Sequence, residues 1–149
     1  MSANISIPFT LAIDDTVDSI RQQTESRSYK AANELRNAAL EVLRGQRSGR
    51  RYRVPGTNSY YTASAPGEPP AARTAGGFRT SWKAKALVES DVYTSRIESD
   101  KRTDNGKFTL GEILEEGTPG GQMAPRPHHE RIIEKAMPEI ERIYSEPYF

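Results

Sequence analysis

Five arginines fall within ten residues near the middle of the chain, and their side chains suit the binding of phosphate or carboxylate groups. They are Arg44, Arg47, Arg50, Arg51 and Arg53, with Tyr52 among them. A guanidinium group stays charged and offers paired N–H donors that match either anion. Two interpretations stay open: a loop that contacts nucleic-acid phosphates, or a basic linker that pairs with acidic flanks of a neighbouring copy. We favour the linker, because the arginines follow the end of a predicted helix and form no groove-reading element.

The chain has two histidines, His128 and His129, and Glu130 follows them. Imidazole and carboxylate groups are common zinc ligands. Adjacent side chains at the start of a helix point in different directions, however, so both rings rarely reach one ion. We therefore expect no metal site here and assign the pair a capping or interface role.

Three nearby glutamates, Glu112, Glu115 and Glu116, could be taken for paired carboxylates that act in acid–base catalysis. No nucleophile, glycine-rich phosphate cradle or complete set of metal ligands accompanies them in the sequence. A solvated acidic edge is the simpler interpretation. The sequence therefore predicts a protein without catalysis, bound metal or cofactor.

The composition fits one domain, residues 1–149, with a small core. Of the 149 residues, 35% are hydrophobic and 28% are charged, and none is cysteine. So few apolar residues indicate either long solvated arms or a subunit that completes its burial against neighbours. Disulfides and thiolate metal sites are excluded. We expect a soluble protein made in a reducing cytoplasm, because neither a signal peptide nor an apolar run of membrane-spanning length is apparent.

The net charge of +1 conceals a strong segregation along the sequence. Residues 44–85 carry nine basic residues against a single acid, Glu68, which leaves +8 on this segment and −7 on the rest of the chain. A basic middle between acidic flanks suits a protein that docks head-to-tail on copies of itself. It equally suits a protein that contacts a polyanion.

The first half of the chain predicts an arm, a long helix and a long loop. Residues 1–12 are interpreted as the arm, with Pro8 opposing a regular helix. Apolar residues spaced by three and four over residues 13–43 then indicate one helix of about 30 residues. Asp14 or Asp15 is its predicted N-cap.

A proline- and glycine-rich loop is predicted over residues 46–77. Within it, residues 54–63 are compatible with a small hairpin around Gly56–Asn58. That hairpin would place Tyr60 and Tyr61 on opposite faces.

The second half of the chain predicts a small sheet and a final helix. Phe78 and Trp82 are four residues apart and would meet across a helical turn. Alternating side chains indicate strands over residues 83–89 and 92–98, while residues 108–115 fit either a third strand or one helical turn.

A final helix is expected to start with Pro127 in its first turn. Its predicted apolar face comprises Ile132, Ile133, Ala136, Met137, Ile140, Ile143 and Tyr144, and Pro138 is expected to kink it. The fold class that follows is α+β, with a long N-terminal helix and a C-terminal helix packed on a small antiparallel sheet, and a long extended loop.

Two motifs in the chain resemble those of the tail-component, or head–tail joining, family of long-tailed bacteriophages. Residues 115–118 (Glu-Glu-Gly-Thr) and 123–128 (Met-Ala-Pro-Arg-Pro-His) are similar to the family's Glu-aromatic-Gly-Thr run, short loop and Met-x-Pro/Ala-Arg-Pro-Phe. Residues 64–71 (Ser-Ala-Pro-Gly-Glu-Pro-Pro-Ala), followed by Arg-Thr and by Phe-Arg-Thr-Ser-Trp at 78–82, resemble the family's Pro-Gly-Glu-Pro-Pro loop before its sheet.

This resemblance implies a structural virion protein of the phage neck, a ring of six or twelve copies that joins the head connector to the tail tube (tail completion). Its implied partners are copies of itself, portal-side adaptor proteins and a tail terminator or tail tube protein, with double-stranded DNA in the lumen and no membrane. The loop over residues 47–74 would reach an adjacent subunit. The alternative that stays open is a nucleic-acid-binding accessory protein that uses the arginine-rich loop.

The chain departs from the family pattern at one corner. Glu116 stands where the family has Phe or Tyr, and His128 and His129 replace an apolar pair, so we expect this polar corner to face a neighbouring subunit. The predicted assembly residues are Arg47, Arg50, Arg51, Arg53, Tyr60, Tyr61, Glu116, Gly117, Thr118, Arg126, Pro127, His128 and His129.

Overall fold

A computed structural model describes residues 9–45, 47–71, 77–103 and 106–149, with side chains described from residue 14 onward. In chain order its elements are α1 (Phe9–Val42), β1 (Arg51–Arg53), β2 (Tyr60–Thr62), the 3-10 helix η1 (Arg79–Ser81), β3 (Lys83–Glu89), β4 (Val92–Glu98), α2 (Leu110–Glu116) and α3 (His129–Ser145). Within the described residues, three α-helices and two antiparallel two-stranded sheets confirm the predicted α+β class.

Helix α1 begins earlier than the sequence predicts. Phe9 is already helical, so Asp14 and Asp15 lie inside the helix and the arm predicted over residues 1–12 is wrong for residues 9–12. Residues 1–8 of that arm lie outside the described part of the chain. A proline just before the first turn is compatible with this start, because the first helical N–H groups have no partner within a helix.

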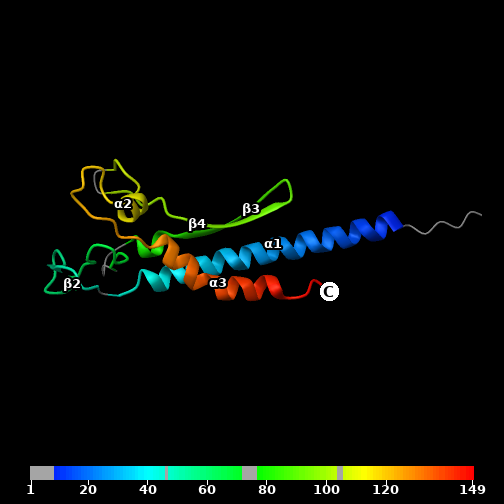
Figure 1. The fold of residues 1–149 in the computed structure, drawn as a ribbon, viewed down its shortest axis with the longest axis horizontal. Helices are drawn as coiled ribbons and strands as arrows, with labels where there is room; N and C mark the ends of the chain where they lie inside the picture. Colours follow the sequence, from blue (N-terminus) through cyan, green and yellow to red (C-terminus); the bar gives the residue numbers. More distant parts are fainter. Residues whose placement is uncertain (1–8, 46, 72–76, 104–105) are drawn as a thin grey trace, which may run out of the picture.

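Helix α1 lies between the β3–β4 sheet and helix α3 (Figure 1). The β3–β4 sheet packs along one side of α1 and α3 packs along another (Figure 1). Small side chains permit this close approach: Ala31, Ala32, Ala38 and Ala39 are at most 5% exposed. The main neighbour of α3 is therefore α1, whereas the sequence predicted both helices on the sheet itself.

Strands β3 and β4 form the antiparallel hairpin that the sequence predicts, paired along their full length. Ser90 and Asp91 make the turn with φ of 49° and 61°, the left-handed conformation that a two-residue hairpin turn requires. Ser95 of β4 donates a 2.7 Å hydrogen bond to the backbone carbonyl of Ser28, which fastens the sheet to α1. Val88 is 50% exposed, so the β3 side chains beside the hairpin turn are not buried.

A second hairpin lies within residues 46–77, where the sequence predicts a long extended loop. β1 pairs with β2 so that Arg51 faces Thr62 and Arg53 faces Tyr60. The turn contains Gly56, at φ 76°, as predicted, but the first strand precedes the predicted range of 54–63. We name residues 50–62 the arginine hairpin.

Glu68 fastens the remainder of this loop. Its carboxylate accepts hydrogen bonds from the Ser48 hydroxyl, from the Ser48 backbone N–H at 3.2 Å and from the Ala65 backbone N–H at 2.8 Å. The Ser48 hydroxyl and these backbone donors hold the pKa of the Glu68 carboxyl below its usual value. The Gly67 N–H also donates to the carbonyl of Pro125, at 3.1 Å. The described part of this loop, residues 47–71, is therefore folded onto itself and onto the segment before α3, not extended.

The last two helices settle one question that the sequence left open and correct the predicted position of Pro127. Helix α2 takes up residues 110–115 of the 108–115 segment, while Thr109 before it forms only an isolated antiparallel bridge with Arg102, so the segment is not a third strand. Pro127 lies two residues before α3 instead of in its first turn, and Pro138 lies inside a continuous helix. The predicted apolar face is partly correct: Ile132, Ala136 and Ile143 are buried, whereas Ile133 is 51% exposed.

The core is one small cluster where the end of α1, η1 and α3 meet. Its buried members are Ala38, Ala39, Leu43, Phe78, Trp82, Ile132 and Ala136. The rings of Phe78 and Trp82 lie 5.7 Å apart, as their spacing predicts. So small a cluster agrees with the low apolar content of the chain.

A buried arginine fastens the C-terminal tail to α1, a contact that the sequence did not predict. Arg27 is 6% exposed, and its guanidinium group donates to the carbonyls of Tyr144, Glu146 and Pro147 at 3.3, 2.6 and 3.0 Å. It also lies 4.0 Å from the centre of the Tyr148 ring. The carbonyls at the end of a helix carry partial negative charge, so they offset the cost of burying this cation.

Candidate functional site

The motif of residues 115–118 and 123–128 forms a closed loop between α2 and α3. The Thr118 N–H donates to the Met123 carbonyl at 3.1 Å, and the Met123 N–H donates to the Thr118 hydroxyl at 2.9 Å. Gly117 is buried at φ 82°, and a Cβ atom there would lie 2.7 Å from the Met123 carbonyl oxygen. Only glycine fits that position. Gly117 and Thr118 therefore build the loop, and we name residues 115–129 the α2–α3 corner.

Arg126 and Pro127 continue this corner toward α3. The Arg126 N–H donates to the Leu114 carbonyl at 2.6 Å, which fastens the extended segment to the end of α2. The Arg126 guanidinium group makes a 3.3 Å hydrogen bond to the Ala124 carbonyl and lines the neighbouring groove. The Arg126 side chain thus faces a concave surface.

The side chain of His128 is fully buried, so the prediction that it faces a neighbouring subunit is wrong. Its ring packs edge-on against Phe78 and Trp82, with centroids 5.7 and 6.1 Å away. This imidazole occupies an aromatic position in the core. His129 and Glu116 are exposed, as predicted.

Glu115 caps the start of α3 from the end of α2. Its Oε2 atom accepts hydrogen bonds from the backbone N–H groups of His128 and His129, at 2.7 and 3.2 Å. A carboxylate at this position satisfies unpaired helical N–H groups and opposes the positive end of the helix dipole. The interpretation of Glu115 as a solvated edge is therefore wrong. No local signal marks it, because the cap arrives from 13 residues upstream.

Burial lowers the pKa of His128 and so favours the neutral ring. Charge on His129 acts in the same direction, while the Arg126 carbonyl and Glu115 act against it. The Nδ1 atom of His128 lies 2.9 Å from the Arg126 carbonyl oxygen and 3.0 Å from Glu115 Oε2. Both neighbours are acceptors, so Nδ1 carries the proton of the neutral ring and Nε2 keeps its lone pair.

The arginine hairpin presents stacked aromatic rings and arginines. Tyr52 and Tyr61 face each other across the two strands, with ring centroids 5.7 Å apart. The Arg51 guanidinium carbon lies 4.5 Å from the centre of the Tyr60 ring, and that of Arg50 lies 5.5 Å from the Tyr52 ring. These contacts support the arginines on aromatic faces without neutralising their charge.

Two of the predicted arginines differ in their surroundings. Arg53 is exposed but donates to Asn58 Oδ1 at 2.7 Å and to the Thr57 carbonyl at 2.8 Å, which closes the hairpin turn. Arg47 donates to the Val42 carbonyl at the end of α1 and does not belong to the exposed cluster. A cation at this position caps the helix C-terminus, so Arg47 serves the fold.

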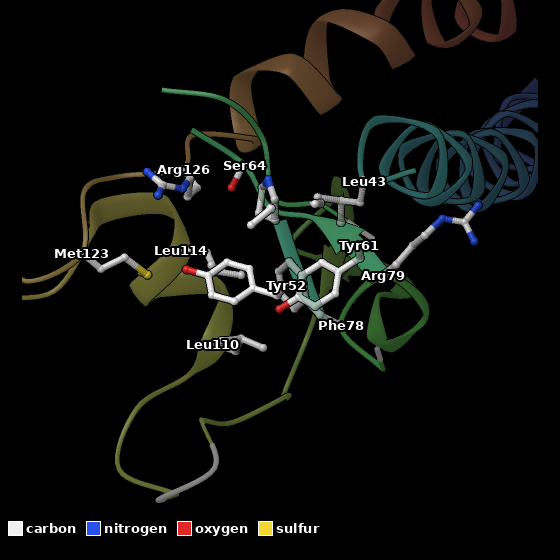
Figure 2. Close-up of a pocket in the computed structure, with 13 residues that line it drawn as sticks. Leu43, Tyr52, Tyr61, Ser64, Phe78, Arg79, Leu110, Leu114, Met123 and Arg126 are labelled. Atoms are coloured by element: carbon white, nitrogen blue, oxygen red, sulfur yellow. The ribbon is translucent and has the colours of Figure 1, made fainter. Parts of the chain in front are cut away.

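A groove of about 440 Å³ joins the arginine hairpin to the α2–α3 corner. In Figure 2, Tyr52 and Tyr61 lie in the middle of the groove. Leu110 and Leu114 of α2 lie on one side of the two rings, and Leu43 and Arg79 lie on the other (Figure 2). Its other lining residues are Ala63, Ser64, Pro70, Ala71, Phe78, Met123 and Arg126. The two motifs that the sequence singles out therefore border one concave surface.

Acidic and basic side chains gather in different parts of the elongated molecule. Near the start of α1, Asp14, Asp15 and Asp18 are exposed, and Asp18 forms a 3.5 Å ion pair with Arg21. The arginine hairpin, marked by the label β2, lies at the opposite end of the molecule in Figure 1. Among the described residues, Arg50 and Arg51 form no ion pair. We name the three aspartates the acidic helix start.

Comparison of the chain with protein-family models, with curated proteins and with solved structures gives no match. Across the described helices, none combines the length and the apolar character needed to cross a membrane.

Proposed function

We propose that this chain is a non-enzymatic structural subunit of a tailed-bacteriophage neck, joining head connector to tail tube in a ring of identical copies. The observation that carries the proposal is the separation of charge between the acidic helix start and the arginine hairpin. In this arrangement the hairpin of one copy contacts the helix start of the next. Six or twelve copies close the ring, which sits in the virion between a portal-side adaptor and a tail terminator or tail tube protein.

Opposite charge at opposite ends favours head-to-tail contact between copies. A contact between two different patches of the same chain is heterologous, and such contacts generate rings when the rotation between copies closes. Complementary charge also sets the register of the contact and speeds encounter at low salt. The small core supports the same proposal, since subunits that bury little alone gain burial against neighbours.

The two family-like motifs add independent support. Residues 115–128 form a closed corner, and residues 64–71 lie against it through the Gly67–Pro125 hydrogen bond. Both border the groove beside the arginine hairpin. Motifs that are distant in sequence thus meet at the surface that the proposal assigns to assembly.

Sedimentation velocity tests the proposal at 50 mM and 500 mM NaCl. We expect the wild-type chain to self-associate with rising concentration at the lower salt and to dissociate at the higher salt, because salt screens exposed charges. The Arg50→Ala/Arg51→Ala/Arg53→Ala variant should stay monomeric at both. A wild-type chain that is monomeric at low salt and high concentration would contradict the proposal.

The control for that variant removes the same charge elsewhere. Lys30→Ala/Lys83→Ala/Arg96→Ala also deletes three exposed basic side chains, and these lie on α1 and the β3–β4 sheet. It should associate as the wild type does. Equal loss of association in both variants would show that only net charge matters.

One observation favours a second candidate function, a nucleic-acid-binding accessory protein. The arginine hairpin combines cations with exposed tyrosine rings: Tyr52 is 42% and Tyr60 53% exposed. Cations contact phosphates and aromatic rings stack on bases of single strands. Both ligand types are therefore available at one hairpin.

Fluorescence anisotropy with labelled double- and single-stranded DNA separates the two functions. If the hairpin binds phosphates, the slope of log K against log salt should shrink by about one for each Arg50→Ala, Arg51→Ala or Arg53→Ala change. Under the ring proposal the isolated chain has little affinity for DNA. Tight, salt-dependent binding by the monomer would favour the accessory protein.

A further inference from the structure

Three potential metal ligands converge at the α2–α3 corner, although the sequence predicted that the two adjacent histidines would point apart and bind no metal. One ligand atom from each of Glu115, His128 and His129 lies within 4.8 Å of those from the other two. The imidazole rings of His128 and His129 are 4.6 Å apart. The expectation that these adjacent side chains diverge is therefore wrong.

The helix start explains why the two rings meet. His128 is the N-cap of α3, with φ −142° and ψ −21°, and His129 is the first helical residue. The divergence of neighbouring side chains holds inside a helix, whereas the non-helical backbone of an N-cap redirects its side chain. Glu115 reaches the same point from α2, because its carboxylate caps this helix start.

The Nδ1 atom of His128 is the ring nitrogen that faces the cluster. It lies 3.0 Å from Glu115 Oε2 and 2.9 Å from the Arg126 carbonyl oxygen. In the ion-free ring the Nδ1 proton lies between these acceptors, and a divalent ion in place of that proton would contact Nδ1 and Glu115 together. The proton of the neutral ring then lies on Nε2, which is buried and meets no hydrogen-bond partner among the described residues.

The surroundings also allow an ion to reach the cluster. His129 is exposed and the Glu115 side chain is 22% exposed, so the cluster is open to solvent on that side. The Trp82 ring lies 6.1 Å from His128 and 6.0 Å from His129. Its Nε1–H is likewise buried and unpaired among the described residues. A donor cannot bind a cation, but it can donate to a water molecule that the cation holds.

We propose that Glu115, His128 and His129 bind a divalent transition-metal ion of the Zn²⁺ class, with water in the remaining position. Two imidazoles and one carboxylate suit a borderline ion such as Zn²⁺ or Co²⁺ and do not suit Ca²⁺ or Mg²⁺, which prefer oxygen ligands. The ion joins the end of α2 to the start of α3. It stabilises the wall of the groove that contains α2, and it does so whether or not the chain assembles into a ring.

Cobalt titration of the full chain without an affinity tag tests this proposal. Co²⁺ bound by nitrogen and oxygen ligands absorbs in the visible region, and the bound paramagnetic ion quenches the emission of Trp82, the single tryptophan of the chain. We expect saturation of both signals at one ion per chain. Zn²⁺ should displace Co²⁺ with the same stoichiometry, and Mg²⁺ at millimolar concentration should not.

Variants identify the ligands. His129→Ala removes an exposed ring and should weaken Co²⁺ binding at least tenfold. His128→Phe keeps an aromatic ring against Phe78 and Trp82 and should abolish saturable binding, with circular dichroism to verify the fold. Glu112→Gln, an exposed neighbour on α2, is the matched control and should bind as the wild type does.

Two results would overturn the proposal. One is the absence of saturable Co²⁺ or Zn²⁺ binding by the wild-type chain. The other is equal binding by the wild type, His129→Ala and His128→Phe, which would place the ion elsewhere.

Discussion

The α2–α3 corner and the arginine hairpin both carry residues whose types suggest function, yet the fold uses them differently. At the corner, Gly117, Thr118 and His128 are engaged by their own chain, through a positive-φ turn, a pair of hydrogen bonds and a buried ring. At the hairpin, Arg51 and Tyr60 are exposed, and the Arg51 guanidinium group lies over the Tyr60 ring.

The difference teaches which residues remain available to a partner. A side chain that is packed or hydrogen-bonded within the fold contributes stability, whereas an exposed charge supported by an aromatic face can still bind. Substitutions at the corner should therefore alter the free energy of unfolding, and substitutions at the hairpin should alter association.

The largest expected effect compares two neighbouring residues of α3 beside the corner. Ile132 is 2% exposed in the core, and Ile133 is 51% exposed. Ile132→Ala should lower the free energy of unfolding by about 2–5 kcal/mol, because it removes buried methyl groups and leaves a cavity. Ile133→Ala should cost under about 1 kcal/mol. Urea denaturation measures both, and equal effects would show that α3 packs through another face.

Next in size is the effect of a methyl group at the corner glycine. Gly117→Ala should destabilise the chain by about 2 kcal/mol, because it combines positive-φ strain with a clash against the Met123 carbonyl. Gly120→Ala is the matched control in the same loop, where a Cβ would meet only the Gln122 side chain, no closer than 3.5 Å. Its effect should stay within about 0.5 kcal/mol. Comparable thermal midpoints for the two variants would contradict the closed corner.

A smaller effect should follow from the titration of His128. Burial holds its pKa below the ordinary value of 6.5, so below pH 6.5 the unfolded chain binds a proton that the folded chain resists. Its contribution to stability is complete above pH 6.5 and declines as the pH falls from there toward the folded-state pKa. Urea midpoints in metal-free buffer between pH 7.5 and 5.5 should therefore fall for the wild type.

The His128→Phe variant provides the control for that pH series. Glu115 and His129, the titratable groups beside the ring, remain in the variant, so only the contribution of His128 disappears. Glu68, Glu98 and Glu139, whose pKa values are lowered, titrate below this range. An unchanged slope in His128→Phe would show that another group causes the pH dependence.

The smallest expected effect on stability belongs to the hairpin. Arg51→Ala and Tyr60→Ala should each change the free energy of unfolding by less than about 0.5 kcal/mol, because both side chains are exposed. The same variants should reduce association in sedimentation. A large loss of stability would mean that the hairpin, like the corner, is part of the core structure.

Local patterns predicted much of the fold. The alternation over residues 83–98 gave both strands of the β3–β4 sheet, and spacings of three and four gave α1 and α3. The start of α1 was placed too late. Pro8 suggested an arm, yet the helix begins at the next residue.

The candidate site was predictable only where the polar composition of a segment implies that its side chains are exposed. Exposed arginines and tyrosines in a polar loop were anticipated, and so was an exposed Glu116. The burial of His128 was not, because it depends on Phe78 and Trp82 lying beside it in three dimensions. Nor was the cap by Glu115, since a helix start is ordinarily satisfied by residues next to it in the sequence.

The most direct test of head-to-tail assembly mixes two charge-reversed chains. One carries Arg50→Glu, Arg51→Glu and Arg53→Glu, and the other carries Asp14→Lys, Asp15→Lys and Asp18→Lys. Each alone has like charges at both ends and should sediment as a monomer at 50 mM NaCl. In an equal mixture, the acidic hairpin of one chain matches the basic helix start of the other, and the unchanged patches match in the same way. Association should therefore return to the wild-type level, with the two chains alternating around a ring that has an even number of copies. Continued monomers in the mixture, or wild-type association by either variant alone, would contradict the account.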